Sequence, residues 1–355
     1  MDLDRLIGCL LGTAVGDALG LPYEKVSPRR APRLFGPPDR YRFVFGRGMV
    51  SDDTEHACLV AQALIASAGD EQAFTSSLAW GLRWWTLSLP AGTGRASIVA
   101  GLKLLVGISP SRSGVFSAGN GPSMRSPILG AVIDDIDQLR RLVRASTRIT
   151  HTDPKAEQGA LVIALAARYA RLDSQPIAAE FLDHLRSVIG HESSRADATE
   201  LFARLDAVRA SIEQGESTTG FAARLCGPRG VSGYVNDTVP VVLHAWLNHP
   251  RDLRTAITQA ILCGGDADTV AAITGAIVGS GVGRAGIPPE LLAGLWEWPR
   301  SSAWIERLAA KLDKAMRTGQ PSSPPRLPVY GLMPRNLLFL AIVLVHALRR
   351  LLPPY

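Results

Sequence analysis

Apolar residues recur along most of the chain at intervals of three and four, which is the spacing of one face of an α-helix. Strict alternation of apolar and polar residues, the pattern of a half-buried strand, is scarce. The helical spacing predicts helices over Arg5–Leu19, Thr54–Ser67, Phe74–Leu87, Asp137–Ser146, Lys155–Ala170, Pro176–Ile189, Ala196–Gln214, Val239–Leu247, Leu253–Cys263, Thr269–Ser280 and Ser302–Met316. So many helices without intervening strands indicate an all-α fold.

Two of the predicted helices carry glycines at helical spacing. Gly12, Gly16 and Gly20 lie four residues apart in the first helix, and Gly275 and Gly279 repeat the pattern in a second apolar helix. Residues four apart share one face of a helix, and glycine leaves that face without side chains. We therefore expect each of these faces to pack closely against another helix backbone at the centre of a bundle.

Two stretches interrupt the helical pattern. Residues 25–48 are rich in proline and arginine, with seven basic residues and a single acid, Asp39. Residues 319–335 have the proline- and serine-rich composition of a linker. The predicted organisation is one helical domain over 1–318, the linker, and a short C-terminal hydrophobic helix or tail over 336–355.

The apolar run of this tail, Leu337–Leu348, is 12 residues long, which is shorter than the roughly 20 residues that span a bilayer. We expect a helix that docks on the domain or on a partner subunit. The alternative is a tail that binds a membrane surface or another protein peripherally, an interpretation that Arg349 and Arg350 favour.

Composition limits the class of protein. Of the 355 residues, 46% are hydrophobic, as expected for a globular chain with a large core. The formal charge of +6 suits an anionic small molecule, but the basic residues do not cluster into a dedicated nucleic-acid surface. The N-terminus lacks the pattern of a signal peptide, because its first charges are acidic and Asp17 interrupts the apolar run. The four cysteines form no CxxC pair, which predicts reduced thiols in a cytoplasmic protein and no zinc site.

Three apolar helices are preceded by polar, acid-containing segments. These are SDDT at 51–54, THTDP at 150–154 and CGGDADT at 263–269. Each has a structural explanation, since one carboxylate at a helix N-terminus caps it. Asp52 and Glu55 have the spacing of a capping box, and Asp153 precedes a proline at the first helical position. Asp266 can likewise cap the helix that follows it.

Two of these segments carry more acid than capping uses. A cap employs one carboxylate, and the helix dipole contributes only about 0.3–1 kcal/mol for an exposed acid. A second carboxylate nearby repels the first, and a bound divalent cation removes that conflict. Oxygen donors without cysteine or a histidine pair favour Mg²⁺ or Mn²⁺ over Zn²⁺. If residues 51–53 and 266–269 meet in space, four aspartates and two hydroxyls can hold two ions about 3.5–4 Å apart.

The order of these segments resembles that of the ADP-ribosylglycohydrolases. The matching stretches, in chain order, are GCLLGTAVGDALGLPYE (8–24), SDDT, SAGNGPSMRSPILG (117–130), THTDP and CGGDADT. Each is a weak pattern alone, whereas five in this order form a specific signal. The resemblance implies a single all-α orthogonal bundle around a central site with two Mg²⁺ or Mn²⁺ ions. It also implies a hydrolase that cleaves the glycosidic bond between ADP-ribose and an acceptor.

The resemblance also assigns roles to residues of this chain. Glu24 is expected to act as general base or to orient water beside the metals, and Asp53 is the other candidate base. Serine 51 stands where the family more often has threonine, and it keeps the ligating oxygen. The implied metal ligands are Ser51, Asp52, Asp53, Asp266, Asp268 and Thr269. The implied ADP-ribose-binding residues are Gly119, Asn120, Gly121, Ser123, Met124 and His151.

Other interpretations of the same residues stay open. A glycine-rich segment is also typical of a surface turn, His151 is also typical of a capping or core histidine, and we expect His56 to make a structural hydrogen bond. The whole chain is alternatively a non-catalytic ADP-ribose binder or structural relative, or a di-metal nucleotide phosphohydrolase. The expected partner is an ADP-ribosylated protein or a small ADP-ribosyl compound, and the residues do not determine the acceptor.

Overall fold

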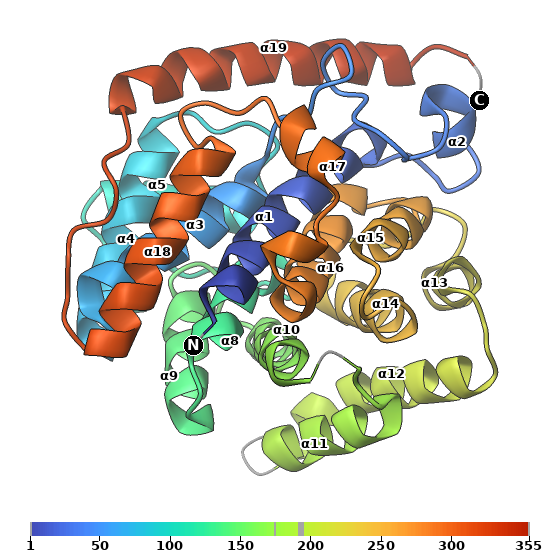
Figure 1. The fold of residues 1–355 in the computed structure, drawn as a ribbon, viewed down its shortest axis with the longest axis horizontal. Coiled ribbons are helices and arrows are strands. Elements are labelled where there is room, and N and C mark those ends of the chain that lie inside the picture. The colour runs from blue at the N-terminus through green and yellow to red at the C-terminus, as the bar shows by residue number, and fades with distance from the viewer. Residues whose placement is uncertain (1, 174, 191–194, 354–355) are drawn as a thin grey trace.

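The computed structural model describes residues 2–173, 175–190 and 195–353, and in these ranges every regular element is a helix, apart from isolated β-bridges (Figure 1). The predicted all-α fold is confirmed. The α-helices are α1 Leu3–Gly20, α2 Ala31–Phe35, α3 Asp52–Ser67, α4 Glu71–Leu87, α5 Arg95–Leu105, α6 Pro110–Ser113, α7 Gly121–Met124, α8 Pro127–Val132, α9 Ile136–Arg148, α10 Pro154–Leu172, α11 Ala178–Gly190, α12 Arg195–Glu213, α13 Thr218–Cys226, α14 Val235–Asn248, α15 Leu253–Leu262, α16 Ala267–Val282, α17 Pro289–Gly294, α18 Ser302–Thr318 and α19 Leu332–Arg350. The 3₁₀ turns are η1 Leu21–Tyr23, η2 Arg284–Gly286 and η3 Val329–Gly331.

Helices α1 and α16 pack against each other at the centre of the molecule (Figure 1). They are surrounded by α3, α8, α10, α15 and α18, while α11 and α12 lie at one edge and α19 runs along the opposite edge. Because helices cover it on all sides, α16 is buried from Ala267 to Gly281. This explains why its sequence is apolar all round instead of along one stripe.

The glycine faces account for the close contact of the two central helices. A Cβ atom on Gly12 would lie 2.1 Å from the carbonyl oxygen of Gly275, and one on Gly16 would lie 2.1 Å from that of Ala271. The expected close backbone approach is confirmed, and the two glycine faces meet each other. The contact continues to Gly20, where an added Cβ would lie 2.5 Å from the Cα of Asp268. It therefore sets the first turn of α16 beside the end of α1.

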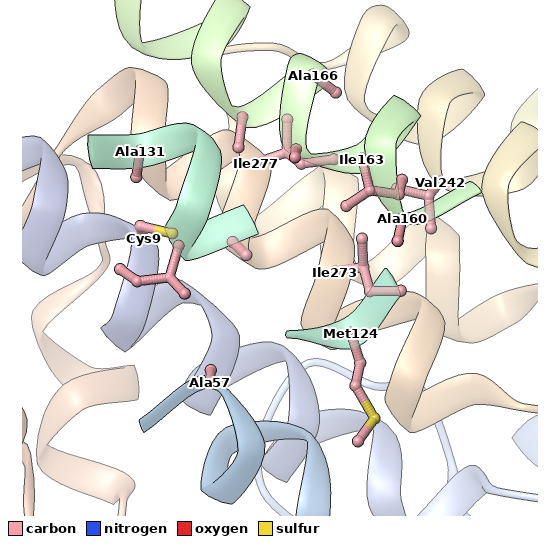
Figure 2. Packing of buried hydrophobic residues seen from close by; sticks show 14 of the residues in the cluster. Cys9, Ala57, Met124, Ala131, Ala160, Ile163, Ala166, Val242, Ile273 and Ile277 are labelled. Atoms are coloured by element: carbon pink, nitrogen blue, oxygen red, sulfur yellow. The ribbon is translucent and has the colours of Figure 1, made fainter. Parts of the chain in front are cut away.

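Buried side chains from many helices form one large core (Figure 2). Cys9 of α1, Ala57 of α3, Ile163 of α10 and Ile273 of α16 are among the residues that Figure 2 shows in it, each 3% exposed or less. Small residues such as alanine recur in this core, which is what helices packed at short distances can accommodate.

Several short helices do not appear in the predicted set. Helices α8 and α17 have six residues each, fewer than two turns, so they show no repeat of the helical period. The longer helix α5 was also not predicted. It contains Gly101, which has no side chain and so leaves room for Thr86, since an added Cβ would lie 2.0 Å from the Thr86 Oγ1. The proline-rich stretch 25–48 also contains a five-residue helix, α2, which its proline- and arginine-rich composition did not predict.

The C-terminal part of the chain differs from the prediction. Helix α19 begins at Leu332, inside the predicted linker, and has 19 residues. The preceding segment is held on the domain, because the Ser322 N–H donates to the Ile65 carbonyl (2.9 Å) and Lys311 donates to the Ser323 carbonyl (2.8 Å). The helix is therefore longer than the 12-residue apolar run that the sequence marks.

Among the described residues, two helical segments are long and apolar enough to cross a membrane by length and composition. One is Leu3–Tyr23, of whose apolar window 94% is buried inside the protein, which identifies it as the core helix. The other is Leu332–Arg350, of whose window only 17% is buried.

The glycine contact predicts a selective effect of one added methyl group. We expect Gly12→Ala to lower the free energy of unfolding by about 1–3 kcal/mol, since a Cβ there must push two helix backbones apart. Urea denaturation measures this change. Gly94→Ala is the matched control, because no atom lies within 4 Å of a Cβ added there. Equal stability of the two variants would contradict the role given to the α1–α16 contact.

Candidate active site

A cleft of about 860 Å³ opens where the N-terminal ends of α3 and α16 meet the loop before α7. Most of the predicted site residues line it, although they come from distant parts of the sequence. Those on its wall are Glu24, Asp52, Gly119, Asn120, Gly121, Met124, His151, Asp266, Asp268 and Thr269. Ser51, Asp53 and Ser123 are buried and do not line the cleft.

The two acidic segments meet in space. The Thr269 hydroxyl at the start of α16 donates a hydrogen bond to Asp53 Oδ2 at the start of α3, at 3.2 Å. Helix α1 connects the two segments: its Gly20 lies against Asp268, and its Asp17 carboxylate accepts from the Ser51 N–H at the start of α3. The convergence on which the sequence-based metal hypothesis depended is present.

Two glycines, Gly264 and Gly265, form the turn that leads into α16 beside the cleft. Gly264 and Gly265 have positive φ angles of 66° and 76°, a conformation that glycine adopts without strain. A Cβ on Gly265 would also lie 2.0 Å from the Val231 carbonyl oxygen. The Lys25 N–H donates to the Gly265 carbonyl at 2.6 Å. This bond fastens the segment that contains Glu24 beside the start of α16.

Helix capping explains few of the carboxylates in the two acidic segments. Ser51 is the N-cap of α3, and its hydroxyl accepts from the Asp53 N–H at 3.3 Å. Asp266 occupies the N-cap position of α16 but makes no side-chain capping bond, and instead its Oδ2 accepts from the Asn120 side chain at 2.6 Å. The capping interpretation was right for Asp153, which accepts from the Lys155 N–H (2.9 Å), and wrong for Asp266.

The capping-box interpretation of Asp52 and Glu55 was also wrong. The Glu55 carboxylate turns away from the helix terminus, accepting from the Trp85 indole N–H at 2.7 Å and from Arg300 at 2.6 Å. Glu55 is only 2% exposed, so it forms part of a buried ion-pair network behind the cleft. Asp52 is left facing the cleft without a capping role.

The cleft brings together buried carboxylates whose negative charges repel one another. Burial, and then the neighbouring carboxylates, raise the pKa values of Asp52, Asp53 and Asp268 well above the usual range. Asp53 Oδ1 and Asp268 Oδ1 are buried without a hydrogen-bond partner. Oxygen atoms of this kind fit a hard divalent cation. Within the described ranges, no three His, Cys, Asp or Glu side chains are already arranged as a ligand set, and the oxygen donors include the hydroxyls of Ser51 and Thr269.

Asp17 is a functional residue that the sequence-based assignment missed. Its carboxylate is fully buried and accepts from the Ser51 N–H (2.9 Å), the Thr54 N–H (3.1 Å) and the Thr54 hydroxyl (2.6 Å). It thereby holds the turn that carries Asp52 and Asp53. Burial raises the pKa of Asp17 to about 6. The signal in the sequence was a lone acid within an apolar, glycine-containing helix.

The glycine-rich loop before α7 lies directly on His151. A Cβ on Gly119 or on Gly121 would lie 3.1 Å or 2.9 Å from the imidazole ring, so neither position has room for a side chain without a shift of the ring. The loop is fastened through Asn120, whose N–H donates to the Gly233 carbonyl and whose side-chain amide donates to Thr238, both at 2.9 Å. The Ser123 side chain is fully buried beside Gly159 of α10 and so lies away from the cleft.

Two buried histidines flank Arg125 beneath the cleft. Burial and the Arg125 guanidinium lower the pKa of His151 to about 3. The Thr150 hydroxyl, which accepts from Arg125 at 2.7 Å, lies 2.9 Å from His151 Nδ1. His56 Nδ1 lies 3.2 Å from Arg125, and its ring meets Trp85 edge-on at 4.3 Å. The expected structural hydrogen bond of His56 is confirmed.

The Asp17 contacts predict a loss of stability when the carboxylate is removed. Asp17→Ala leaves two buried N–H groups without an acceptor, which costs about 1–3 kcal/mol for each unsatisfied group. We expect a lower free energy of unfolding in urea, and a smaller loss for Asp17→Asn, which keeps one acceptor oxygen. A change below about 0.5 kcal/mol in Asp17→Ala would contradict this role.

The low pKa of His151 predicts a pH-dependent contribution to stability. At pH values below 6.5, the ordinary pKa of histidine, the unfolded chain binds a proton at this residue. The folded chain does not bind it until the pH approaches about 3. Stability is therefore lost as the pH falls. The unfolding free energy of the wild type minus that of His151→Gln should decrease by about 1.4 kcal/mol per pH unit from about pH 6 to about pH 4. A difference that does not change with pH would show that the ring binds a proton as readily in the folded chain as in the unfolded chain.

Comparison with known proteins identifies the relatives of this chain. The family model of the ADP-ribosylglycohydrolases matches residues 1–322. A protein of Archaeoglobus fulgidus without an assigned function is 30% identical, over 87% of this chain and 96% of the relative. The ADP-ribosyl-[dinitrogen reductase] glycohydrolase of Rhodospirillum rubrum is 25% identical, over 88% and 93%. Human ADP-ribosylhydrolase ARH3 is also 25% identical, over 81% and 87%.

The fold agrees with this assignment. A solved ADP-ribosylglycohydrolase-related protein complex contains a chain that superposes with a TM-score of 0.62 and 26% identity, over 88% of this chain and 98% of that one. The family match covers every residue of the cleft described above and ends before α19. The protein therefore belongs to the ADP-ribosylglycohydrolase family of hydrolases.

Proposed function

We propose that this protein is a cytoplasmic, metal-dependent hydrolase that cleaves the N- or O-glycosidic bond between ADP-ribose and an acceptor. The observation that carries the proposal is the meeting of residues 51–53 with 266–269 beside a glycine-rich loop, in one cleft of a chain that belongs to this family. The name of the Rhodospirillum rubrum relative, an ADP-ribosyl-[dinitrogen reductase] glycohydrolase, supports the same substrate class. The cysteines in the described ranges are all free, in keeping with a reducing compartment.

The cleft suits a nucleoside diphosphate sugar. Gly119 and Gly121 have no side chains, so a diphosphate can approach the backbone of their loop closely. Lys25, Arg95 and Arg229 also line the cleft and complement an anionic substrate. We assign the diphosphate and the adjoining ribose to this loop, with His151 beneath it.

The carboxylates of the two acidic segments suit two Mg²⁺ or Mn²⁺ ions. Bound there, the ions would supply Lewis acidity and lower the pKa of water. Two residues outside the ligand set orient it: Asn120 fixes the Asp266 carboxylate, and Asp17 fixes the 51–54 turn. The residues proposed to hold the ions are Ser51, Asp52, Asp53, Asp266, Asp268 and Thr269.

Glu24 is the proposed general base. It lies on the cleft wall, whereas Asp53 is 1% exposed and is engaged by the Thr269 hydroxyl. As the oxygen of a water molecule bonds to the anomeric carbon, the bond from that carbon to the acceptor breaks through an oxocarbenium-like state. Glu24 takes the proton of the water and passes it to the departing amine or hydroxyl.

The metal assignment predicts a gain of stability on adding the ion. A cation that relieves the repulsion among the buried carboxylates should raise the melting temperature of the folded protein, by an amount equivalent to about 2.7 kcal/mol at a hundredfold excess over the dissociation constant. Asp268→Asn should weaken this response to Mg²⁺ or Mn²⁺. Asp70→Asn, at an N-cap carboxylate of α4 away from the cleft, should retain it. An equal response of both variants would place the ions elsewhere.

The activity itself is tested by product analysis. With mono-ADP-ribosylated arginine, serine and other defined conjugates, we expect chromatography to detect free ADP-ribose when Mg²⁺ or Mn²⁺ is present. Asp266→Ala should reduce its release about a hundredfold or more, because charge stabilisation by a metal is worth several kcal/mol. Asp70→Asn is again the control. Activity that resists both EDTA and Asp266→Ala would refute the metal mechanism.

Two other products would identify the alternative functions. Calorimetric binding of ADP-ribose without turnover of any conjugate would indicate a non-catalytic binder. Release of phosphate from a nucleotide, without free ADP-ribose, would indicate a phosphohydrolase.

A further inference from the structure

Helix α19 is an addition to the family domain. The family match ends at residue 322, whereas α19 extends from Leu332 to Arg350. Figure 1 shows it as a single long helix that lies flat along one edge of the molecule, outside the other helices. A helix of 19 residues is about 28 Å long, so it presents an extended strip on that edge.

The outward face of α19 is entirely apolar. From Met333 to Leu352, every residue with an exposed side chain is apolar. Leu344, Val345 and Leu348 are 55%, 64% and 63% exposed. A helix on the surface of a water-soluble domain normally has polar residues on its outer face. Continuous apolar surface of this extent marks an interaction site.

Three polar residues of α19 face the protein. Arg335 pairs with Glu297 at 2.6 Å, the Asn336 side chain donates to the Ser88 carbonyl at 2.7 Å, and His346 Nε2 lies 2.8 Å from the Phe43 carbonyl oxygen. Phe339 packs between them against Phe43, at 5.4 Å between ring centroids. The helix is therefore fixed on the domain with its polar side inward and its apolar side outward, the reverse of an ordinary surface helix.

The residues around this face suit an anionic lipid surface. Phe45 is fully exposed on the loop beside α19, and the exposed rings of Trp298 and Tyr330 lie 6.2 Å apart near its first turn. Aromatic rings of this kind are favoured at the level of lipid headgroups. No acidic residue occurs from Leu332 to Tyr355. Arg349 lies near the end of the apolar face, where it donates to the Pro353 carbonyl at 2.8 Å, whereas Arg350 points inward to the Leu21 and Pro22 carbonyls.

Basic residues continue beside the end of α19. The Arg30 side chain donates to the Leu352 carbonyl at 2.9 Å, which brings the arginine-rich segment 25–48 against the helix. Arg29 and Arg33 of that segment are exposed. We propose that α19 lies in the plane of an anionic membrane surface, with its apolar face in the lipid and arginines 29, 33 and 349 at the headgroups.

Two other arrangements fit the contacts less well. In a twofold dimer formed through this face, the arginine-rich segments of both copies, each with seven basic residues and one acid, would add like charges to one interface. If α19 crossed the bilayer instead, Arg335, Asn336 and His346 would leave their partners and enter hydrocarbon. Glu297 would then lose the arginine that neutralises it. An in-plane orientation keeps all of these contacts.

Vesicle sedimentation of the full-length protein tests this proposal. We expect it to sediment with vesicles of phosphatidylcholine and phosphatidylglycerol, more weakly with phosphatidylcholine alone, and less as the salt concentration rises. Leu344→Gln/Leu348→Gln should reduce the partition coefficient about tenfold or more. The matched control is Leu102→Gln/Leu172→Gln, which changes two leucines that are equally exposed on α5 and α10 and should leave binding unchanged.

Three results would overturn the proposal. The first is equal vesicle binding of the wild type and the Leu344→Gln/Leu348→Gln variant, or none by either. The second is a wild-type dimer, seen by analytical ultracentrifugation, that this variant converts to a monomer without any vesicle binding. The third is resistance of the bound wild type to alkaline carbonate extraction, which indicates a spanning helix. None of these readouts depends on hydrolysis, so the proposed activity is tested separately.

Discussion

The contact between the backbones of α1 and α16 is the constraint on which the rest of the structure depends. Glycine on both helices lets carbonyl oxygens of one lie where the side chains of the other would otherwise be. This places the first turn of α16 against the end of α1, so that Asp268 and Glu24 belong to the same corner of the molecule. Asp17, on the same α1, then accepts from the start of α3 and brings the second acidic segment to that corner.

The cleft that results is electrostatically costly. Burial and mutual repulsion raise the pKa values of its aspartates, and two of their oxygens have no hydrogen-bond partner. A fold selected for stability alone would not gather carboxylates in this way. The proposed metal ions would compensate this repulsion, and Asn120 and Asp17 hold Asp266 and the 51–54 turn in place.

A buried ion network joins this site to the C-terminal helix. Arg335 of α19 pairs with Glu297 and donates to the carbonyl of Val50, the residue before Ser51. Glu55, one turn further along α3, accepts from Arg300 and Trp85. Helix α19 is thus attached to the segment that carries Asp52 and Asp53. The orientation of α19 on a surface therefore also sets the orientation of the cleft relative to that surface.

The sequence by itself determined the helical class, the long helices and the close approach at the glycine faces, since each depends on local spacing. The segments that line the cleft were assigned from the order of motifs that resembles a known family. Roles of single carboxylates were less accessible. Asp266 and Glu55 have the local pattern of capping residues, and only the tertiary structure gives them partners far along the chain, Asn120 and Arg300. Asp17 was missed because its role depends on a bond to residue 51.

The tertiary structure also determined which face of α19 is exposed. Its apolar residues predict a helix, but the side that faces water depends on where Arg335 and Asn336 find their partners, Glu297 and Ser88. Local sequence sets the conformation of a segment through backbone and neighbouring side-chain energies. Which carboxylates meet, and which face stays exposed, is set by packing between residues that are from 34 to more than 200 positions apart.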